Sequence, residues 1–199
     1  MKKLVGSGIG IVLSAAAVYV FAPRGDALPL SATAEIPALV RDGDVICRLG
    51  DRSWSRWFKN VSPRDRRFSH AGIARIRNGR VTVIHAEGWR DSDFVREEAL
   101  EDFLEIARAA GVYRLNTDDG DLMAILAAEY TGVPFDWRFD REDSTALYCT
   151  ELIDVVLSRL PAPRRLEAVF FKGAGKEIIP LESISRSKLF TEVFYRSGG

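Results

Sequence analysis

Residues 68–87 read FSHAGIARIRNGRVTVIHAE, and this stretch decides the fold. Asn78 and Gly79 divide it into two runs of alternating apolar and polar residues, which is the strongest short-range signal of a β-hairpin with a two-residue turn. His70 stands in the first run and His85 in the second, and they are the two histidines of the chain. We therefore predict an antiparallel hairpin that carries both histidines.

The register of this hairpin places its polar side chains on one side. If position 77 faces position 80, Glu87 faces His70, and His85 lies diagonally from His70. Side chains two residues apart on a strand share a face, so all three project in the same direction. Diagonal neighbours lie about 7–8 Å apart by backbone, within reach of an imidazole and a polar group that holds it. Either His85 or Glu87 can therefore orient His70.

A second signal surrounds Cys149. The sequence predicts a helix that starts at Ser144 or Thr145 and runs to about Leu160, with Cys149 in its first turn. A thiol is a weak nucleophile at neutral pH unless its thiolate is stabilised, and a helix N-terminus beside an imidazole does this in two ways. The unpaired backbone N–H groups there can also bind the oxyanion formed at an attacked carbonyl. We predict that Cys149 is a nucleophile and that His70 is its base.

The flanking segments predict the rest of an α+β domain. Alternation in residues 45–49 predicts a half-buried strand with Cys47 in the core. Helical periodicity predicts helices over 97–110 and 121–131, with a short strand at 112–115 between them. The histidine hairpin and these strands lead us to expect a central antiparallel sheet.

Residues 1–22 predict a membrane anchor or a signal segment. Two lysines precede an uncharged run over 4–22 that is just long enough to span a bilayer. The lysines predict a cytoplasmic N-terminus and a domain outside the cytoplasm, periplasmic or extracellular. The small-x-small site at 32–34 lies well past the run, which favours an uncleaved anchor over a cleaved signal peptide. Residues 23–40 predict a linker, and residues 41–199 a single domain.

The overall charge is balanced, with 28 basic and 28 acidic residues. No net field therefore favours a nucleic acid, and we predict no nucleic-acid partner. Two other arrangements of the candidate residues stay open. An exported protein can join Cys47 to Cys149 in a disulfide, and His70, His85 and Cys149 are ligand types that suit zinc. Because no other residues show ligand spacing, we predict no metal and no other cofactor.

Five segments between residues 41 and 155 form a more specific, ordered signal. These segments are Gly43-Asp44-Val45-Ile46, Ser69-His70-Ala71-Gly72-Ile73, Val83-Ile84-His85-Ala86, Gly132-Val133-Pro134-Phe135-Asp136 and Leu147-Tyr148-Cys149-Thr150-Glu151-Leu152. They resemble the permuted papain-like cysteine hydrolases of the YaeF/YiiX type, relatives of NlpC-type cell-wall peptidases and of lecithin retinol acyltransferase. The resemblance implies a circularly permuted papain-like (NlpC-like) α+β domain in which an antiparallel sheet packs against the helix that bears the nucleophilic cysteine.

The same resemblance implies roles for three residues. Cys149 is the nucleophile, His70 the general base, and His85 the third polar residue that orients the imidazole. The third position in close relatives often looks like glutamate, whereas here it is a histidine, as in the acyltransferase branch. Since Glu87 stands two residues further on, the choice between His85 and Glu87 stays open.

We expect a cysteine amidase or peptidase-like hydrolase that forms a thioester on Cys149 and acts on an amide or ester outside the cytoplasm. The expected substrate is a small peptide, a muropeptide or a lipid. One alternative is a lipid acyltransferase or thioesterase of the lecithin retinol acyltransferase type, and another is a catalytically silent module that binds a peptide or lipid.

Overall fold

The computed structural model describes residues 28, 30–50, 58–88 and 93–198. The predicted anchor over residues 1–22 lies outside this part of the chain. Among the described residues, no helix combines the length and the apolar character that a membrane crossing requires.

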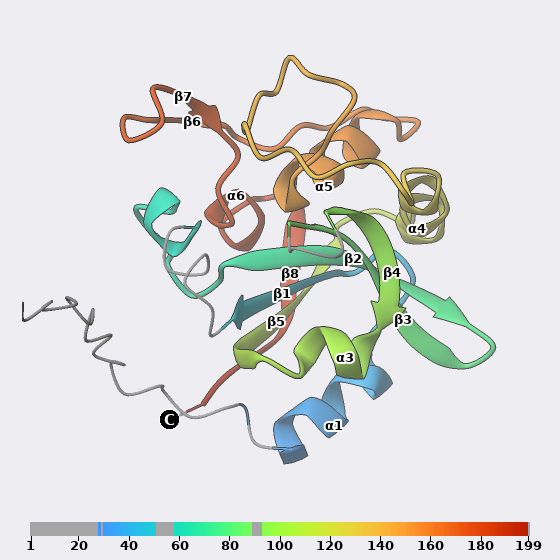
Figure 1. Cartoon of the computed structure of the whole chain (residues 1–199). Coiled ribbons are helices and arrows are strands. Elements are labelled where there is room, and N and C mark those ends of the chain that lie inside the picture. Colours follow the sequence, from blue (N-terminus) through green and yellow to red (C-terminus); the bar gives the residue numbers. More distant parts are fainter. Residues whose placement is uncertain (1–27, 29, 51–57, 89–92, 199) are drawn as a thin grey trace, which may run out of the picture.

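A six-stranded antiparallel sheet forms the centre of the domain (Figure 1). Its strands are β1 (Val45–Gly50), β2 (His70–Arg77), β3 (Arg80–Glu87), β4 (Phe94–Ala99), β5 (Ala107–Leu115) and β8 (Phe190–Ser197). They lie side by side in the order β4-β3-β2-β1-β5-β8, and every neighbouring pair is antiparallel. A small second sheet pairs β6 (Val169–Phe171) with β7 (Lys176–Ile178).

The hairpin predicted from residues 68–87 is formed by β2 and β3. Arg77 pairs with Arg80, which is the predicted register. Asn78 and Gly79 have φ angles of 52° and 74°, and a type I′ turn requires positive φ at both of its central residues. The turn chemistry therefore sets the pairing of the two histidine-bearing strands.

Helices cover both faces of this sheet (Figure 1). One face carries α4 (Gly120–Ala128), α5 (Cys149–Ser158) and α6 (Glu182–Ser185), and the other carries α1 (Leu30–Leu39) and α3 (Leu100–Leu104). Neighbouring residues of β1 enter different cores, Val45 on the α5 side and Ile46 on the α3 side. Strand β1 is therefore buried on both faces, and not half-buried as predicted, while Cys47 lies in the core as expected.

The linker predicted over residues 23–40 is wrong in its second half. Helix α1 packs there against α3 and β8. Ile36 and Val40, four positions apart and so on the same side, are buried in the core of that face. Because these apolar side chains lie against the sheet, the folded domain begins before residue 41.

The helix predicted over residues 97–110 is also wrong. The segment contains the end of β4, the five-residue helix α3 and the start of β5. Within this segment Glu98 of β4 pairs with Val83 of β3, and Ala110 of β5 pairs with Arg48 of β1. This pairing overrides the helical preference of the local sequence, since short apolar runs do not separate helix from strand by periodicity alone. The helix predicted over 121–131 is confirmed as α4.

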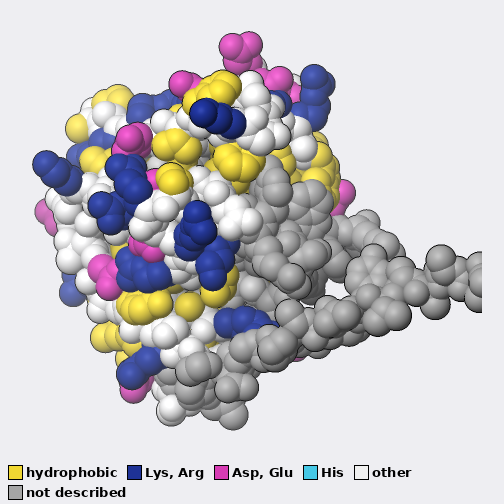
Figure 2. All heavy atoms as spheres, turned by 90° about the vertical axis from the view of Figure 1, so that its left-hand side faces the viewer, with side chains coloured by type: hydrophobic (Ala, Val, Ile, Leu, Met, Phe, Trp, Pro, Cys, Tyr) yellow, Lys and Arg dark blue, Asp and Glu magenta, His cyan; other side chains and the backbone are white. Residues whose placement is uncertain are grey.

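Charged side chains of both signs are interspersed with apolar ones on the face drawn in Figure 2. The basic loop that precedes β2 is largely neutralised by acidic partners. Arg64 Nε lies 3.1 Å from Glu182 Oε1, and Arg67 Nη2 lies 2.9 Å from Asp65 Oδ2. This loop is therefore part of an ion-pair network that ties it to α6.

Candidate active site

Cys149 is the first residue of α5, which begins later than predicted. Tyr148 is extended, with φ −97° and ψ 171°, and the N–H of Leu147 donates to the carbonyl of Pro134 at 2.9 Å. These contacts keep the preceding residues out of the helix. The hydroxyl of Thr150 donates to the carbonyl of Ile179 at 2.6 Å and anchors the first turn. The thiol is therefore held at the N-terminus of a fixed helix.

The Cys149 thiol is buried, with 1% of the residue exposed. Burial raises its pKa to about 11, and the backbone N–H groups of Ala71, Thr150 and Cys149 itself, with the charge of Arg48, oppose that rise only in part. The thiol is therefore protonated at neutral pH. A neighbouring base must take its proton before it can act as a nucleophile.

His70 and His85 form a hydrogen-bonded pair. His70 Nε2 lies 2.8 Å from His85 Nδ1, and the two rings are inclined by 84°. His85 is fully buried, whereas His70 is partly exposed. Phe103 of α3 packs against both rings, with centroid distances of 5.7 and 5.1 Å. Because these nitrogens bond to each other, they do not converge with Cys149 on a shared zinc ion, the alternative left open by the sequence.

Glu87, the other candidate for orienting His70, is bound elsewhere. Its two oxygens accept hydrogen bonds from Arg48 Nη2 at 2.8 Å and from Arg96 Nη2 at 2.7 Å. Of the two groups that share this face of the hairpin, it is His85 that bonds to His70.

The surroundings favour neutral imidazoles. Burial lowers the pKa of His70 well below its usual value, and the positive charges of Arg48 and Arg96 and the neighbouring His85 lower it further. Burial also lowers the pKa of His85, although the carboxylate of Glu98 partly opposes this. At neutral pH His70 therefore has an unprotonated ring nitrogen, which a general base needs.

Backbone packing brings the start of α5 to the strand that carries His70. Helix α5 packs on β2, and the Ala71 N–H that interacts with the thiol belongs to the residue directly after His70. Within the described part of the chain, no hydrogen bond joins Cys149 Sγ to the His70 ring, a contact that often tightens only when substrate binds. Since His70 Nε2 is hydrogen-bonded to His85, Nδ1 is the nitrogen of His70 that can accept the proton of the thiol.

The two cysteines are free thiols. Cys47 pairs with Ala71 across β1 and β2, so it is buried close to the site, and burial together with Cys149 raises its pKa. The disulfide between Cys47 and Cys149 that the sequence left open is not formed. Cys149 is thus available for chemistry.

Gly72 leaves room for the buried His85. A Cβ added at Gly72 would lie 2.5 Å from Val83 Cγ1, 2.8 Å from His85 Cβ and 2.9 Å from the Ile84 carbonyl oxygen. We expect Gly72→Ala to lower the free energy of unfolding by about 1–3 kcal/mol, as overpacking does, and to displace the His85 ring. Urea unfolding followed by circular dichroism measures the loss. Gly79→Asn is the control for changing a glycine of the same hairpin without a clash: space is open there, and asparagine tolerates the φ of 74° better than other residues, so a smaller loss is expected. Equal stability of Gly72→Ala and wild type would contradict the prediction.

Among the residues that the structure describes, the side chains that could hold a metal ion are His85, Glu87 and Glu98, whose ligand atoms lie within 4.8 Å of one another. They do not fit this role, because guanidinium groups already neutralise both carboxylates. Arg96 lies 2.7 Å from Glu87 and 2.8 Å from Glu98, and Arg48 lies 2.8 Å from Glu87. A divalent cation would have to displace these two arginines.

Glu98, Arg96 and Arg48 were missed by the sequence analysis. Read as a strand, the segment Phe94–Ala99 places Arg96 and Glu98 on one face, two residues apart. That signal was hidden because Glu98 fell within a predicted helix.

An antiparallel sheet that bears two histidines and packs against a helix beginning at a cysteine defines a papain-like α+β domain. A family model described as permuted papain-like amidase enzyme, YaeF/YiiX, C92 family, matches residues 39–191. The chain belongs to this family, which places it among amidase-type hydrolases at the family level.

Among solved structures, the chain is similar to the metalloprotein yiiX from Escherichia coli O157:H7, with a TM-score of 0.67 and 19% sequence identity. The similarity covers 80% of this chain and 99% of that one, and at this identity it shows the fold alone. No curated protein matches the chain.

Proposed function

We propose that the protein is a cysteine hydrolase that cleaves an amide or ester bond through a thioester on Cys149. His70 is the general base, and His85 orients its ring. The observation that carries this proposal is the hydrogen-bonded His70–His85 pair on strands that pack against the start of α5. Family membership supports amide hydrolysis as the reaction class. Because the buried Cys149 thiol has a raised pKa, it needs a base to become a nucleophile.

The proposed reaction has two halves. His70 Nδ1 takes the proton of Cys149 Sγ, and the thiolate attacks the substrate carbonyl. Backbone N–H groups at the start of α5 hold the oxyanion, and His70 gives the proton to the departing amine or alcohol, which leaves a thioester. His70 then takes a proton from water, which attacks the thioester, and the acid and the free thiol are released.

Trapping of the acyl-enzyme tests this proposal. We expect the full-length protein, incubated briefly with p-nitrophenyl acetate and quenched in acid, to carry one acetyl group on Cys149 and none on Cys47. Both thiols are buried, so acetylation of Cys47 would reveal direct reaction of a thiol with the reagent, without help from a base. Peptide mass spectrometry locates the group. Acetylation of both cysteines at similar rates, or of neither, would argue against a specific nucleophile.

We place the domain outside the cytoplasm, with a small peptide or muropeptide amide as the preferred substrate. The support is the lysine pair before the uncharged run over residues 4–22. Protease added to intact spheroplasts should degrade the domain. Protection until the membrane is lysed would place it in the cytoplasm.

A lipid acyltransferase is the second candidate. An apolar pocket of about 680 Å³ lies between α1 and α3 and is lined in part by Leu100 and Leu104. Phe103, on the same helix, packs against the histidine rings, so α3 contacts both the pocket and the site. Transfer of the acyl group from Cys149 to an added lipid amine, in preference to release of free acid, would favour this function.

A further inference from the structure

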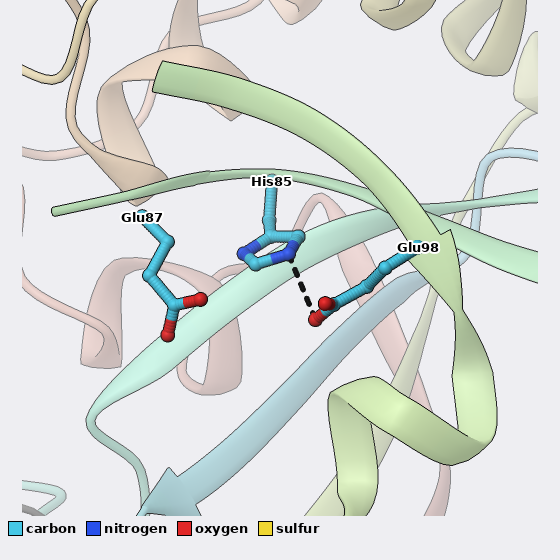
Figure 3. A group of neighbouring side chains, drawn as sticks. All are labelled: His85, Glu87 and Glu98. Atoms are coloured by element: carbon cyan, nitrogen blue, oxygen red, sulfur yellow. Dashed lines mark ion pairs between the residues drawn. The ribbon is translucent and has the colours of Figure 1, made fainter. Parts of the chain in front are cut away.

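The side chain of Glu98 on β4 points toward the ring of His85 (Figure 3), so it adds one more group to the pair that His85 forms with His70. Its Oε1 lies 3.0 Å from His85 Nε2, and its Oε2 lies 2.8 Å from Arg96 Nη2. The pairing of β3 with β4 causes this proximity, since Arg96 faces His85 and Glu98 shares the face of Arg96. Glu98 Oε1 is buried, and within the described residues no donor forms an aligned hydrogen bond with it, so its contact with His85 Nε2 is close but not ideally directed. The His85 ring is thus its close polar neighbour.

This contact decides which nitrogen of His85 carries a proton. Burial alone would raise the pKa of Glu98, but the close contact with the His85 ring and the charges of His85, Arg96 and Arg48 outweigh burial and lower it. Glu98 is therefore ionised at neutral pH and can only accept. A carboxylate oxygen at 3.0 Å from an unprotonated ring nitrogen would set two lone pairs against each other. Nε2 of His85 thus carries the proton, and Nδ1 is an acceptor.

The tautomer of His85 fixes the tautomer of His70. Since His85 Nδ1 accepts, His70 Nε2 must be the donor across the 2.8 Å contact. A neutral imidazole holds one ring proton, so Nδ1 of His70 then has a lone pair. This is the form that can take a proton from a thiol.

We propose that Glu98 is a positioning residue of the active site. Its carboxylate holds His85 in the Nε2–H tautomer, and His85 holds His70 with the Nδ1 lone pair available to the thiol of Cys149. The role in catalysis rests on the proposed function, whereas the tautomers of the two rings are independent of it.

The reverse proton arrangement is the one in which Arg96 Nε donates to His85 Nε2, a hydrogen bond that the geometry allows at 3.5 Å. This hydrogen bond is long, and the Glu98 oxygen lies nearer to the same nitrogen, at 3.0 Å. Arg96 also binds Glu87 and Glu98 through Nη2. The Glu98 carboxylate, rather than Arg96, therefore sets the protonation of His85 Nε2.

Histidine ¹⁵N NMR of the full-length protein reads the tautomers directly, because the chain holds only two histidines. We expect both rings as Nε2–H in the wild type, with His85→Gln used for assignment. In Glu98→Gln the rings should become mixed or Nδ1–H, and iodoacetamide should label Cys149 about 10–100-fold more slowly at neutral pH. Glu98→Asp, which keeps the charge, should restore part of both signals, and Glu98→Ala takes the place of Glu98→Gln if that variant does not fold.

Glu97→Gln is the matched control. Glu97 is the adjacent residue on β4, but it pairs with Arg75 at 3.6 Å and accepts from Thr82 Oγ1 at 2.6 Å. The tautomers and the labelling rate should stay at wild-type values in this variant.

Unchanged tautomers in Glu98→Gln would overturn the inference. Zn²⁺ added alone to the metal-free wild type gives a second possible contradiction. Tight binding that perturbs the His85 ring and is lost in Glu98→Gln would make the cluster a metal site and would overturn the inference. Failure of the proposed function has a different signature. Wild-type Cys149 would then label slowly with an ordinary pH profile, while Glu98→Gln still changed the tautomers.

Discussion

Replacing Cys149 with alanine is expected to lower the rate of p-nitrophenyl acetate hydrolysis by about 10⁶-fold, the scale of loss when the nucleophile of a catalytic triad is removed. The physical reason is that no other described group at the start of α5 can form the thioester. Release of p-nitrophenol, followed by absorbance with the full-length protein at neutral pH, measures the effect. The acetylated species should vanish in the same variant.

Cys47→Ala is the matched control for this loss. Cys47 is fully buried in β1, so its removal tests whether a missing thiol in the core by itself lowers activity. We expect hydrolysis near the wild-type rate. Hydrolysis by Cys149→Ala at the wild-type rate would rule out a cysteine mechanism and leave the family fold with another chemistry.

Replacing His70 with asparagine is expected to slow alkylation of Cys149 by about 10²–10⁴-fold at neutral pH, the usual contribution of a general base. The pH dependence should change as well. Burial and the charges of Arg48 and Arg96 lower the pKa of His70, so its base form persists below pH 6.5 in the wild type. Wild-type labelling should therefore stay fast into mildly acidic solution and fall only when His70 becomes protonated.

Without the imidazole, labelling depends on ionisation of the thiol alone. Burial raises the pKa of Cys149 to about 11, so in His70→Asn the rate should climb with pH through the alkaline range. Limiting iodoacetamide with peptide mass spectrometry gives both profiles. Equal labelling of both proteins in denaturant is the control, and superimposable profiles of the folded proteins would exclude His70 as the base.

Local sequence was sufficient for the part of the site that a single hairpin builds. Asn78 and Gly79 favour a two-residue turn with positive φ, and this turn imposes one register on β2 and β3. That register places His70 and His85 on one face. Cys149 could likewise be assigned to a helix start, although the helix begins some residues later than expected because Leu147 is held in an extended bridge.

Contacts between distant segments decide which residue binds His70, a choice that the hairpin alone leaves open between His85 and Glu87. Simple facing geometry favours Glu87 as the partner of His70, but Arg48 from β1 and Arg96 from β4 bind its carboxylate. His85 therefore makes the hydrogen bond. Neither arginine can be placed from the sequence, since strand order is a long-range property.

The sequence by itself determined the hairpin, its register, the shared face of the two histidines and a cysteine at a helix start, because turn chemistry and side-chain periodicity act over a few residues. Only the tertiary structure decided that residues 94–99 form a strand, that α1 belongs to the domain, and that Glu98 lies against His85. Those outcomes depend on pairing with β3 and on burial against the sheet. Such interactions outweigh the local preference for helix or linker once the chain is compact.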